Sequence, residues 1–303
     1  MPTSPSSSTP QSPSTPRASS IPPSTRPTRD QRRELAREQA REARLRQQRA
    51  ARRTRVVVIG VVVVALLGLV ASIVVAAMHA REGRVNADEV LYPGDTPALA
   101  DVTVPSTADP TSGGIPVSAA GVGERGDGVT VDVYLDPMCP WCGVLEQING
   151  ADLADLVAQD AVTVVYHPVA VLDHTSRGGV YSTRAVNALG MVADRAPEAF
   201  PAFLTELFAE GTQPKEGTTG LDDDALASLA RDAGVPDDVV ETFTERTDSG
   251  RTFAGWAAAT APLIPPNSSG RAVTPTVLID GQRWEGDFTV PGTLRAAIES
   301  ARP

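Results

Sequence analysis

Apolar and polar residues alternate along residues 129–135 (VTVDVYL), and this period of two predicts a β-strand with one face toward a core. The run 161–166 (AVTVVY) predicts a second strand. Between the two, a helix is expected over about 140–157, with apolar core candidates at helical spacing. A strand, a helix and a strand in so few residues favour a βαβ unit with a right-handed crossover.

The following residues, about 170–265, are predicted to form a helical block. Large apolar residues at positions 200, 203, 204, 207 and 208 make one helical face, and a second face follows over 221–233. The acidic run 222–224 (DDD) begins the second helix, where carboxylates are expected to cap the N-terminus rather than to bind calcium. A further helix is expected over about 251–261.

The C-terminal part returns to a strand pattern. Residues 276–279 (TVLI) predict an apolar strand, Asp280-Gly281 a tight hairpin turn, and residues 282–284 the partner strand. A last helix is expected over about 291–301, and a short strand over 115–118. Residues 115–303 are therefore expected to form one α/β domain, in the order βαβ, helical block, β-hairpin and helix.

Residues 56–78 form a run of 23 residues without a charge (VVVIGVVVVALLGLVASIVVAAM). As a helix this run is roughly 34 Å long, enough to cross a hydrocarbon core of about 30 Å. Its length disfavours a cleaved signal peptide, and the arginines before it disfavour a buried core helix. The run predicts a single transmembrane anchor in the cell membrane, with its arginine-rich flank in the cytoplasm and residues 79–303 on the other side.

The segments that flank this anchor carry little that could build a core. Of residues 1–29, 22 are Ser, Thr or Pro, which predicts a disordered cytoplasmic tail over 1–30. Residues 31–55 combine arginines with glutamates three or four positions away, a pattern that favours a solvated basic helix beside the membrane. Residues 79–114 are expected to be an extracytoplasmic linker.

The charge of the chain is divided unevenly. Residues 1–55 hold 13 Arg against four Asp or Glu, a formal charge of +9, so residues 56–303 carry −19 in a chain whose net charge is −10. The acidic body argues against a globular domain that binds nucleic acid, because phosphate contacts need Lys and Arg. Two cysteines are too few for a disulfide-stapled mini-domain or a multi-cluster metal protein.

These two cysteines form the motif Cys139-Pro140-Trp141-Cys142, between a predicted strand and a predicted helix. The dipole and the free N–H groups at a helix start stabilise a thiolate at Cys139 and lower its pKa. Cys139 is therefore the predicted nucleophile and leaving group. Cys142, one helical turn inward, is the predicted resolving thiol.

Three other interpretations of the pair are open. A structural zinc site needs four ligands, which His167 and His174 would complete at an unusual spacing. A structural disulfide across so short a loop restrains the unfolded chain little. Two buried, inert thiols are the third alternative, which the position between a strand and a helix disfavours. We expect neither a bound metal nor a cofactor.

The motif and its surroundings resemble the DsbA-like thioredoxin-fold family of disulfide oxidoreductases, in particular its membrane-anchored members. The resemblance rests on residues 134–142 (YLDPMCPWC) and on the downstream run 273–277 (VTPTV). The resemblance covers about residues 115–303. It implies a thioredoxin-like fold with a helical insertion. By the same resemblance Pro275 is cis, its loop faces the reactive sulfur, and the Thr274 backbone pairs with a bound substrate segment.

Two features favour this family over thioredoxin itself. Cys142 and Pro275 are 133 positions apart, more than one helix and one strand need, and the predicted helical block fills this gap. Met138 stands where thioredoxin-like reductases usually carry Trp. The family often places an acid on the strand that faces the buried cysteine, whereas here the inward positions are apolar. Asp136 is expected near the surface.

Two further side chains are candidates for the site. His167 is expected at the end of the second strand, on the motif's side of the sheet, where it could tune the thiolate. An ordinary hydrogen-bonded loop histidine is the other interpretation. Trp141 is a candidate substrate-facing aromatic residue. The dipeptide Pro140-Trp141 matches neither the commonest oxidase nor the commonest reductase dipeptide of the family, so it leaves the redox poise open.

These features predict a single-pass membrane protein whose extracytoplasmic domain exchanges disulfides with exported proteins that bear cysteines. Oxidation of the substrates fits an oxidising compartment and a chain without further cysteines. By the resemblance, a quinone-linked membrane protein would reoxidise the pair. Two other functions stay open: a reductase or isomerase of the same fold, and a non-catalytic module that binds exported polypeptides.

Overall fold

The computed structural model describes residues 96–248 and 250–302. The predicted tail (1–30), basic helix (31–55) and membrane anchor (56–78) lie outside the described residues. Within the described residues, no helix combines the length and the apolar character needed to span a bilayer.

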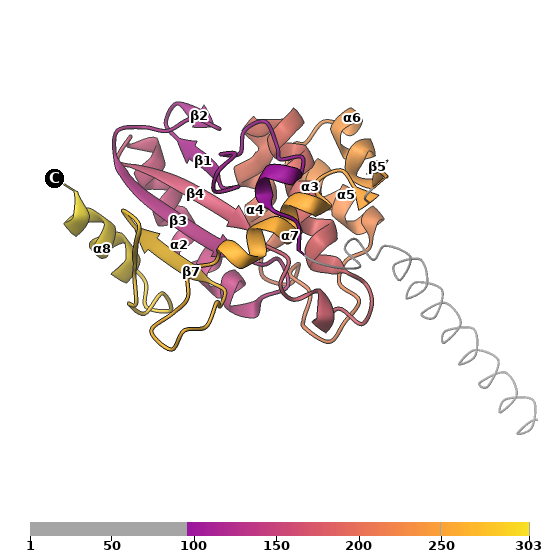
Figure 1. Ribbon diagram of the computed structural model, residues 1–303. Helices are drawn as coiled ribbons and strands as arrows, with labels where there is room; N and C mark the ends of the chain where they lie inside the picture. Colours follow the sequence, from indigo (N-terminus) through magenta and orange to yellow (C-terminus); the bar gives the residue numbers. More distant parts are fainter. Residues whose placement is uncertain (1–95, 249, 303) are drawn as a thin grey trace, which may run out of the picture. The chain divides into compact units, whose positions relative to one another are not determined.

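A six-stranded sheet, in the order β2-β1-β4-β3-β7-β8, organises the described part of the chain (Figure 1). Its strands are β1 (Ile115–Ser118), β2 (Gly121–Val122), β3 (Val129–Leu135), β4 (Val162–Pro168), β7 (Thr276–Ile279) and β8 (Gln282–Arg283). Within this sheet β3 and β4 pair in parallel, and the other neighbours pair antiparallel. The predicted strands and the βαβ unit are confirmed.

The helix α2 (Pro140–Ala158) makes the crossover from β3 to β4. Three alternate side chains of β3, Val131, Val133 and Leu135, join the main core together with side chains of α2. Tyr134, between them in sequence, belongs to a second and smaller cluster. Because successive side chains of a strand point to opposite faces, α2 covers one face of the sheet and the Tyr134 cluster lies on the other.

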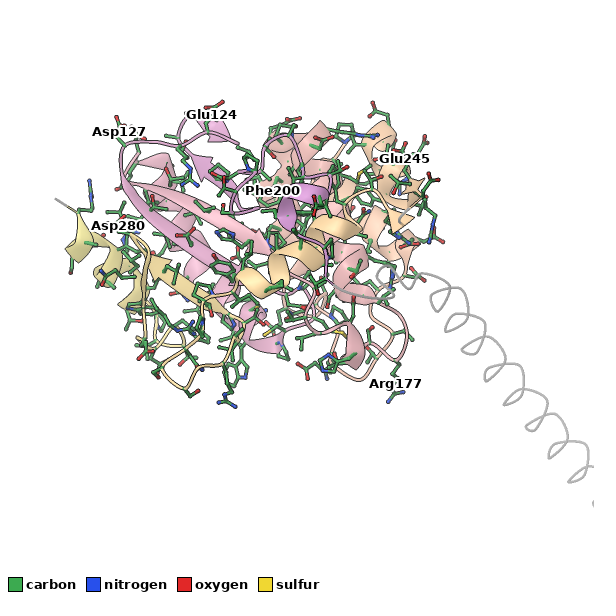
Figure 2. The ribbon with its side chains drawn as sticks, in the orientation of Figure 1. Glu124, Asp127, Arg177, Phe200, Glu245 and Asp280 are labelled. Carbon is green, nitrogen blue, oxygen red and sulfur yellow. The ribbon has the colours of Figure 1, made fainter. Side chains whose placement is uncertain are left out.

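The helical block predicted over about 170–265 follows β4 and precedes β7 in sequence, and Figure 1 shows most of its helices at one side of the sheet. Its helices are α3 (Tyr181–Arg195), α4 (Phe200–Leu207), α5 (Asp223–Asp232), α6 (Asp237–Val240) and α7 (Ala254–Thr260). Short elements join them: η2 (Asp173–Thr175), η3 (Pro197–Ala199), η4 (Glu241–Thr244), η5 (Ala261–Leu263) and the small sheet of β5 (Arg246–Thr247) and β6 (Gly250–Arg251). Phe200, labelled in Figure 2, is fully buried, and its ring lies 6.1 Å from that of Tyr166 in β4.

A helix start and a hairpin turn both have the structure that the sequence predicts. Asp222 caps α5, because its side chain accepts a hydrogen bond from the N–H of Ala225 at 2.8 Å. The hairpin turn between β7 and β8 has positive φ at Asp280 (48°) and Gly281 (75°), as this two-residue turn requires. The chain then ends with α8 (Thr293–Ala301), close to the predicted last helix.

Residues 96–114, expected to belong to a linker, pack on the helical insertion instead. After η1 (Leu99–Asp101), the hydroxyl of Thr107 donates to the carbonyl of Ala193 at 2.9 Å. The indole N–H of Trp256 donates to the carbonyl of Gly113 at 2.9 Å. A fully buried Trp needs an acceptor for that N–H, and this segment supplies it. The sequence pattern did not predict this packing, because the residues that contact the segment are far from it in sequence.

Candidate active site

Cys139 lies at the N-cap of α2, directly after the loop that leaves β3. Its backbone is extended (φ −75°, ψ 115°), and Pro140 occupies the first helical turn, where a missing N–H costs nothing. Both cysteines are free thiols, and only 4% of Cys139 and 1% of Cys142 are exposed. The end of β3 and the start of α2 therefore present a buried thiol pair at the edge of the parallel strands.

The thiol of Cys139 faces the loop that precedes β7. Its Sγ donates a hydrogen bond to the carbonyl of Thr274 at 3.4 Å, and the Thr274–Pro275 bond is cis, as the resemblance implies. A hydrogen bond with the Cys142 thiol lowers the pKa of Cys139 to about 7 against the effect of burial, helped by the Thr274 side chain and by the N–H groups of Cys142 and Trp141. Such a thiol is substantially ionised at neutral pH.

Cys142 lies in a different environment. Burial raises its pKa well above the ordinary value, and the hydrogen bond with Cys139 acts in the same direction. The backbone N–H of Asp136 reaches its sulfur at 3.5 Å. The motif thus combines one readily ionised thiol with one that stays protonated.

Asp136 is fully buried, so the expectation that it lies near the surface is wrong. Its Oδ1 accepts hydrogen bonds from Met138 N at 2.8 Å and Ser182 Oγ at 2.7 Å. Its Oδ2 accepts from Val171 N at 2.8 Å and Leu172 N at 2.9 Å. Burial raises the pKa of Asp136 to about 6, although the hydrogen bonds from Ser182, Met138 and Leu172 oppose that rise. The carboxyl group fastens the cysteine loop to the helical insertion.

The insertion contacts the same loop at two other points. The hydroxyl of Thr175 donates to the sulfur of Met138 at 3.3 Å. The Nε2 of Gln213 donates to the carbonyls of Pro137 at 3.2 Å and of Cys139 at 2.8 Å. No local sequence pattern marks Gln213, because it lies 74 residues from Cys139.

The mouth of the site is partly aromatic. Pro140 is exposed, and Trp141 exposes 59% of its surface. The Trp141 ring meets the edge of Phe288 at a centroid distance of 6.4 Å. An exposed apolar side chain therefore stands beside the buried nucleophile candidate, in a position to contact a bound polypeptide.

His167 lies away from the two cysteines. It pairs in register with Tyr134, its ring stacks on the Tyr134 ring at 4.1 Å, and its Nε2 lies 2.9 Å from Oδ1 of Asp132. Since Tyr134 is on the sheet face opposite α2, these contacts provide no direct link from His167 to the thiols. His174 is exposed, and its Nδ1 lies 3.1 Å from the Val171 carbonyl. No cluster suited to a metal ion occurs among the described His, Cys, Asp and Glu side chains.

Glu146 is a second buried carboxyl group, one helical turn after Cys142. It is 6% exposed, and its Oε1 accepts a hydrogen bond from the Thr205 hydroxyl at 3.3 Å. Its Oε2 has no hydrogen-bond partner among the described residues. Burial raises the pKa of Glu146 to about 7. The charged form is therefore penalised in the folded protein.

We expect Glu146→Gln to raise the free energy of unfolding at pH 8 by about 2 kcal/mol, because the neutral amide avoids burying a charge. The folded-state pKa of about 7 exceeds the ordinary 4.5, so wild-type stability from this group is complete below pH 4.5 and is lost as pH rises to about 7. Urea unfolding at both pH values measures the difference, with the exposed Glu210→Gln as the control. Equal stabilities of Glu146→Gln and wild type at pH 8 would contradict this assignment.

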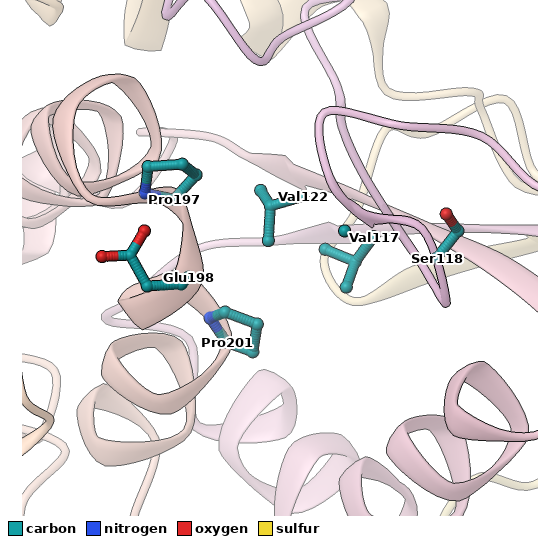
Figure 3. Close-up of a pocket in the computed structure, with 7 residues that line it drawn as sticks. Val117, Ser118, Val122, Pro197, Glu198 and Pro201 are labelled. Atoms are coloured by element: carbon teal, nitrogen blue, oxygen red, sulfur yellow. The ribbon is translucent and has the colours of Figure 1, made fainter.

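A pocket of about 420 Å³ lies at another edge of the sheet (Figure 3). The β1–β2 hairpin and the segment around η3 line it, through Val117, Ser118, Gly121, Val122, Pro197, Glu198 and Pro201. None of these residues belongs to the cysteine motif or to the Thr274 loop. The pocket is therefore separate from the thiol pair.

Comparison with known proteins agrees with this geometry. Residues 119–300 match the protein-family model described as thioredoxin. Reduced DsbA from Mycobacterium tuberculosis is similar in structure, with a TM-score of 0.50 and 28% identity over 62% of this chain and 91% of that one. MdbA, a thiol-disulfide oxidoreductase from Actinomyces oris, has a TM-score of 0.53 and 20% identity over 69% of this chain and 98% of that one.

A curated relative shares part of the sequence. The serine/threonine-protein kinase PknE of Mycobacterium tuberculosis is 31% identical in an alignment of 147 positions that covers 45% of this chain. The match covers 26% of PknE, so the chain spans about a quarter of that relative. The family model, by contrast, covers more than half of this chain, including the C-x-x-C motif and the cis-proline loop. The chain therefore belongs to the thioredoxin family, as a DsbA-like thiol–disulfide oxidoreductase with the close pair Cys139 and Cys142.

Proposed function

We propose that the chain donates disulfides to exported proteins through the pair Cys139 and Cys142. The observation that carries this proposal is the difference between the two thiols. The hydrogen bond with Cys142 is the largest of the effects that lower the pKa of Cys139 to about 7. Burial raises the pKa of Cys142 and keeps that thiol protonated. A sulfur that is stable as a thiolate is a good leaving group, so a disulfide at Cys139 is readily reduced by a substrate.

The exchange takes place in two steps. A substrate thiolate attacks Cys139, so that a substrate–Cys139 disulfide forms while the Cys139–Cys142 bond breaks and Cys142 takes up a proton. The second thiolate of the substrate then attacks the substrate sulfur of this mixed disulfide. The substrate leaves with its own disulfide, oxidised by two electrons, and Cys139 leaves as the thiolate.

The substrate class follows from the rim of the site. The Thr274 carbonyl lies 3.4 Å from the Cys139 sulfur, and Trp141 is largely exposed beside it. A backbone acceptor and an aromatic surface next to a buried thiol suit an extended, unfolded polypeptide. We assign the Thr274–Pro275 loop to backbone pairing with that segment and Trp141 to apolar contact.

The cellular arrangement is part of the same proposal. Residues 56–78 would anchor the chain in the cell membrane, with 1–55 in the cytoplasm and the oxidoreductase domain outside it. Each catalytic cycle leaves the cysteine pair reduced by two electrons, with Cys142 as a thiol and Cys139 as a thiolate. A quinone-linked membrane oxidoreductase is the class of partner that would remove these electrons.

The reduction potential of the cysteine pair tests the direction of exchange. Full-length chain is equilibrated with reduced and oxidised glutathione at a series of ratios, and its free thiols are counted by alkylation. The chain has two cysteines, so the signal comes from this pair alone. An oxidising potential supports a disulfide donor, whereas a potential like that of thioredoxin would make the protein a reductase.

A further inference from the structure

The loop that follows α4 reaches the cysteine motif through one side chain, Gln213. Its Nε2 donates hydrogen bonds to two backbone carbonyls, those of Pro137 at 3.2 Å and Cys139 at 2.8 Å. The Cys139 carbonyl also accepts from Cys142 N at 3.0 Å and Gly143 N at 3.3 Å, the first hydrogen bonds of α2. A side chain of the insertion therefore shares the acceptor that begins the active-site helix.

Gly143 provides the space for this contact. A Cβ built at Gly143 would lie 2.1 Å from the Oε1 of Gln213, and its three nearest heavy atoms all belong to the Gln213 amide. The amide therefore lies directly against the backbone of the first helical turn. A glycine at this buried position costs helix propensity, and it leaves room for the amide.

The two carbonyls that Gln213 holds lie on either side of Met138, and the second belongs to Cys139 itself. Fixing them fixes the backbone that carries the Cys139 sulfur relative to the N–H groups of Trp141 and Cys142, which lower the pKa of that thiol. Oriented N–H donors stabilise a thiolate only when they point at it. We propose that Gln213 is a positioning residue through which the helical insertion holds Cys139 in its reactive geometry. This inference rests on the thiol chemistry proposed for Cys139.

A second glutamine serves as a control for the alternative that Gln213 has only a structural role. Gln147, on α2, also donates from its Nε2 to a backbone carbonyl of this region, that of Phe208 at 2.8 Å. This hydrogen bond links α2 to the beginning of the same loop and does not involve the cysteine motif. If Gln213 acted only by fastening the loop to α2, the two glutamines would be equivalent.

The test is a pH titration of the thiolate absorbance of the full-length chain in the ultraviolet. We expect Gln213→Ala to raise the measured pKa of Cys139 by about one unit, a tenfold fall in the ratio of thiolate to thiol at a given pH. Gly143→Ala is expected to shift it in the same direction, because its methyl group would displace the Gln213 amide, which supplies the three heavy atoms nearest to it. Gln147→Ala is expected to titrate like wild type.

Two results would overturn the inference: a wild-type titration for both Gln213→Ala and Gly143→Ala, or an equal shift in Gln147→Ala. If Gln213→Ala does not fold, Gly143→Ala decides alone, since the atoms that it displaces are the end of a flexible side chain. The titration does not depend on the direction of electron flow. A wild-type Cys139 with an ordinary thiol pKa would instead contradict the proposed function.

Discussion

Cys139→Ser is expected to reduce thiol–disulfide exchange to the uncatalysed rate. A hydroxyl cannot form the mixed disulfide, and Cys142 cannot replace the nucleophile because burial holds it protonated at 1% exposure. The assay follows the loss of free thiols from a reduced, unfolded protein mixed with the oxidised chain. The Cys139→Ser chain is added at the same concentration for comparison.

Cys142→Ala is the matched variant, and the mixed disulfide between Cys139 and a substrate is expected to accumulate on it. It keeps the reactive Cys139 thiol but lacks the second thiol of the chain, so a mixed disulfide formed with a substrate cannot be resolved from within the chain. For this variant the substrate is a protein that carries a disulfide: the Cys139 thiolate attacks one of its sulfurs, the mixed disulfide forms, and the other substrate sulfur leaves as a thiol. Non-reducing electrophoresis should show this adduct accumulating on Cys142→Ala and none on Cys139→Ser. Residual exchange by Cys139→Ser, or an adduct that forms on Cys142 instead, would contradict the assigned roles.

Asp136→Ala is expected to lower the free energy of unfolding by about 3 kcal/mol. The fully buried carboxyl group accepts hydrogen bonds from Met138, Ser182, Val171 and Leu172, and its removal leaves these donors without that acceptor. The loss is smaller than four separate hydrogen bonds would give, because burial already penalises the charge and raises the pKa of Asp136 to about 6. Urea unfolding near pH 7.5 measures the change.

Two variants frame this result. Asp136→Asn keeps one acceptor oxygen and is expected to lose less stability than Asp136→Ala. Asp155→Ala removes a carboxylate at the protein surface, 2.7 Å from Arg295, and is expected to unfold at nearly the same urea concentration as wild type, because solvent screens such a pair. If Asp136→Ala were as stable as Asp155→Ala, the carboxyl group would not fasten the cysteine loop to the insertion.

Local sequence patterns were sufficient for the elements that frame the site. The alternation along β3, the helical spacing in α4 and the Asp280-Gly281 turn each depend on neighbours in sequence, and each has the predicted structure. The position of the thiol pair between a strand and a helix start depends on the same local information. These features follow from strand and helix periodicity and from turn chemistry.

The features that the sequence did not predict depend on distant partners. Asp136 is buried because Val171, Leu172 and Ser182, 35 to 46 residues downstream, surround its carboxyl group. Residues 96–114 are ordered by contacts such as that of Gly113 with Trp256, 143 residues away. A pattern read over one helix or strand contains no information on such pairs.

His167 illustrates the same limit within one strand pair. Its place near the end of β4 agrees with expectation, but the register opposite Tyr134 turns its side chain to the sheet face away from α2. Strand register decides which face a side chain occupies, and a shift by one residue would reverse it. The strand itself could be predicted from its composition. The sheet face that its last side chains occupy depends on how β4 pairs with β3, which the composition does not show.

The reduction potential of the Cys139–Cys142 pair in the full-length chain tests the central claim most directly. We expect a value near that of DsbA, about −120 mV, because a stabilised Cys139 thiolate favours the reduced form and makes the disulfide a strong oxidant. A value near that of thioredoxin, about −270 mV, would contradict disulfide donation and would assign the protein to reduction of its substrates.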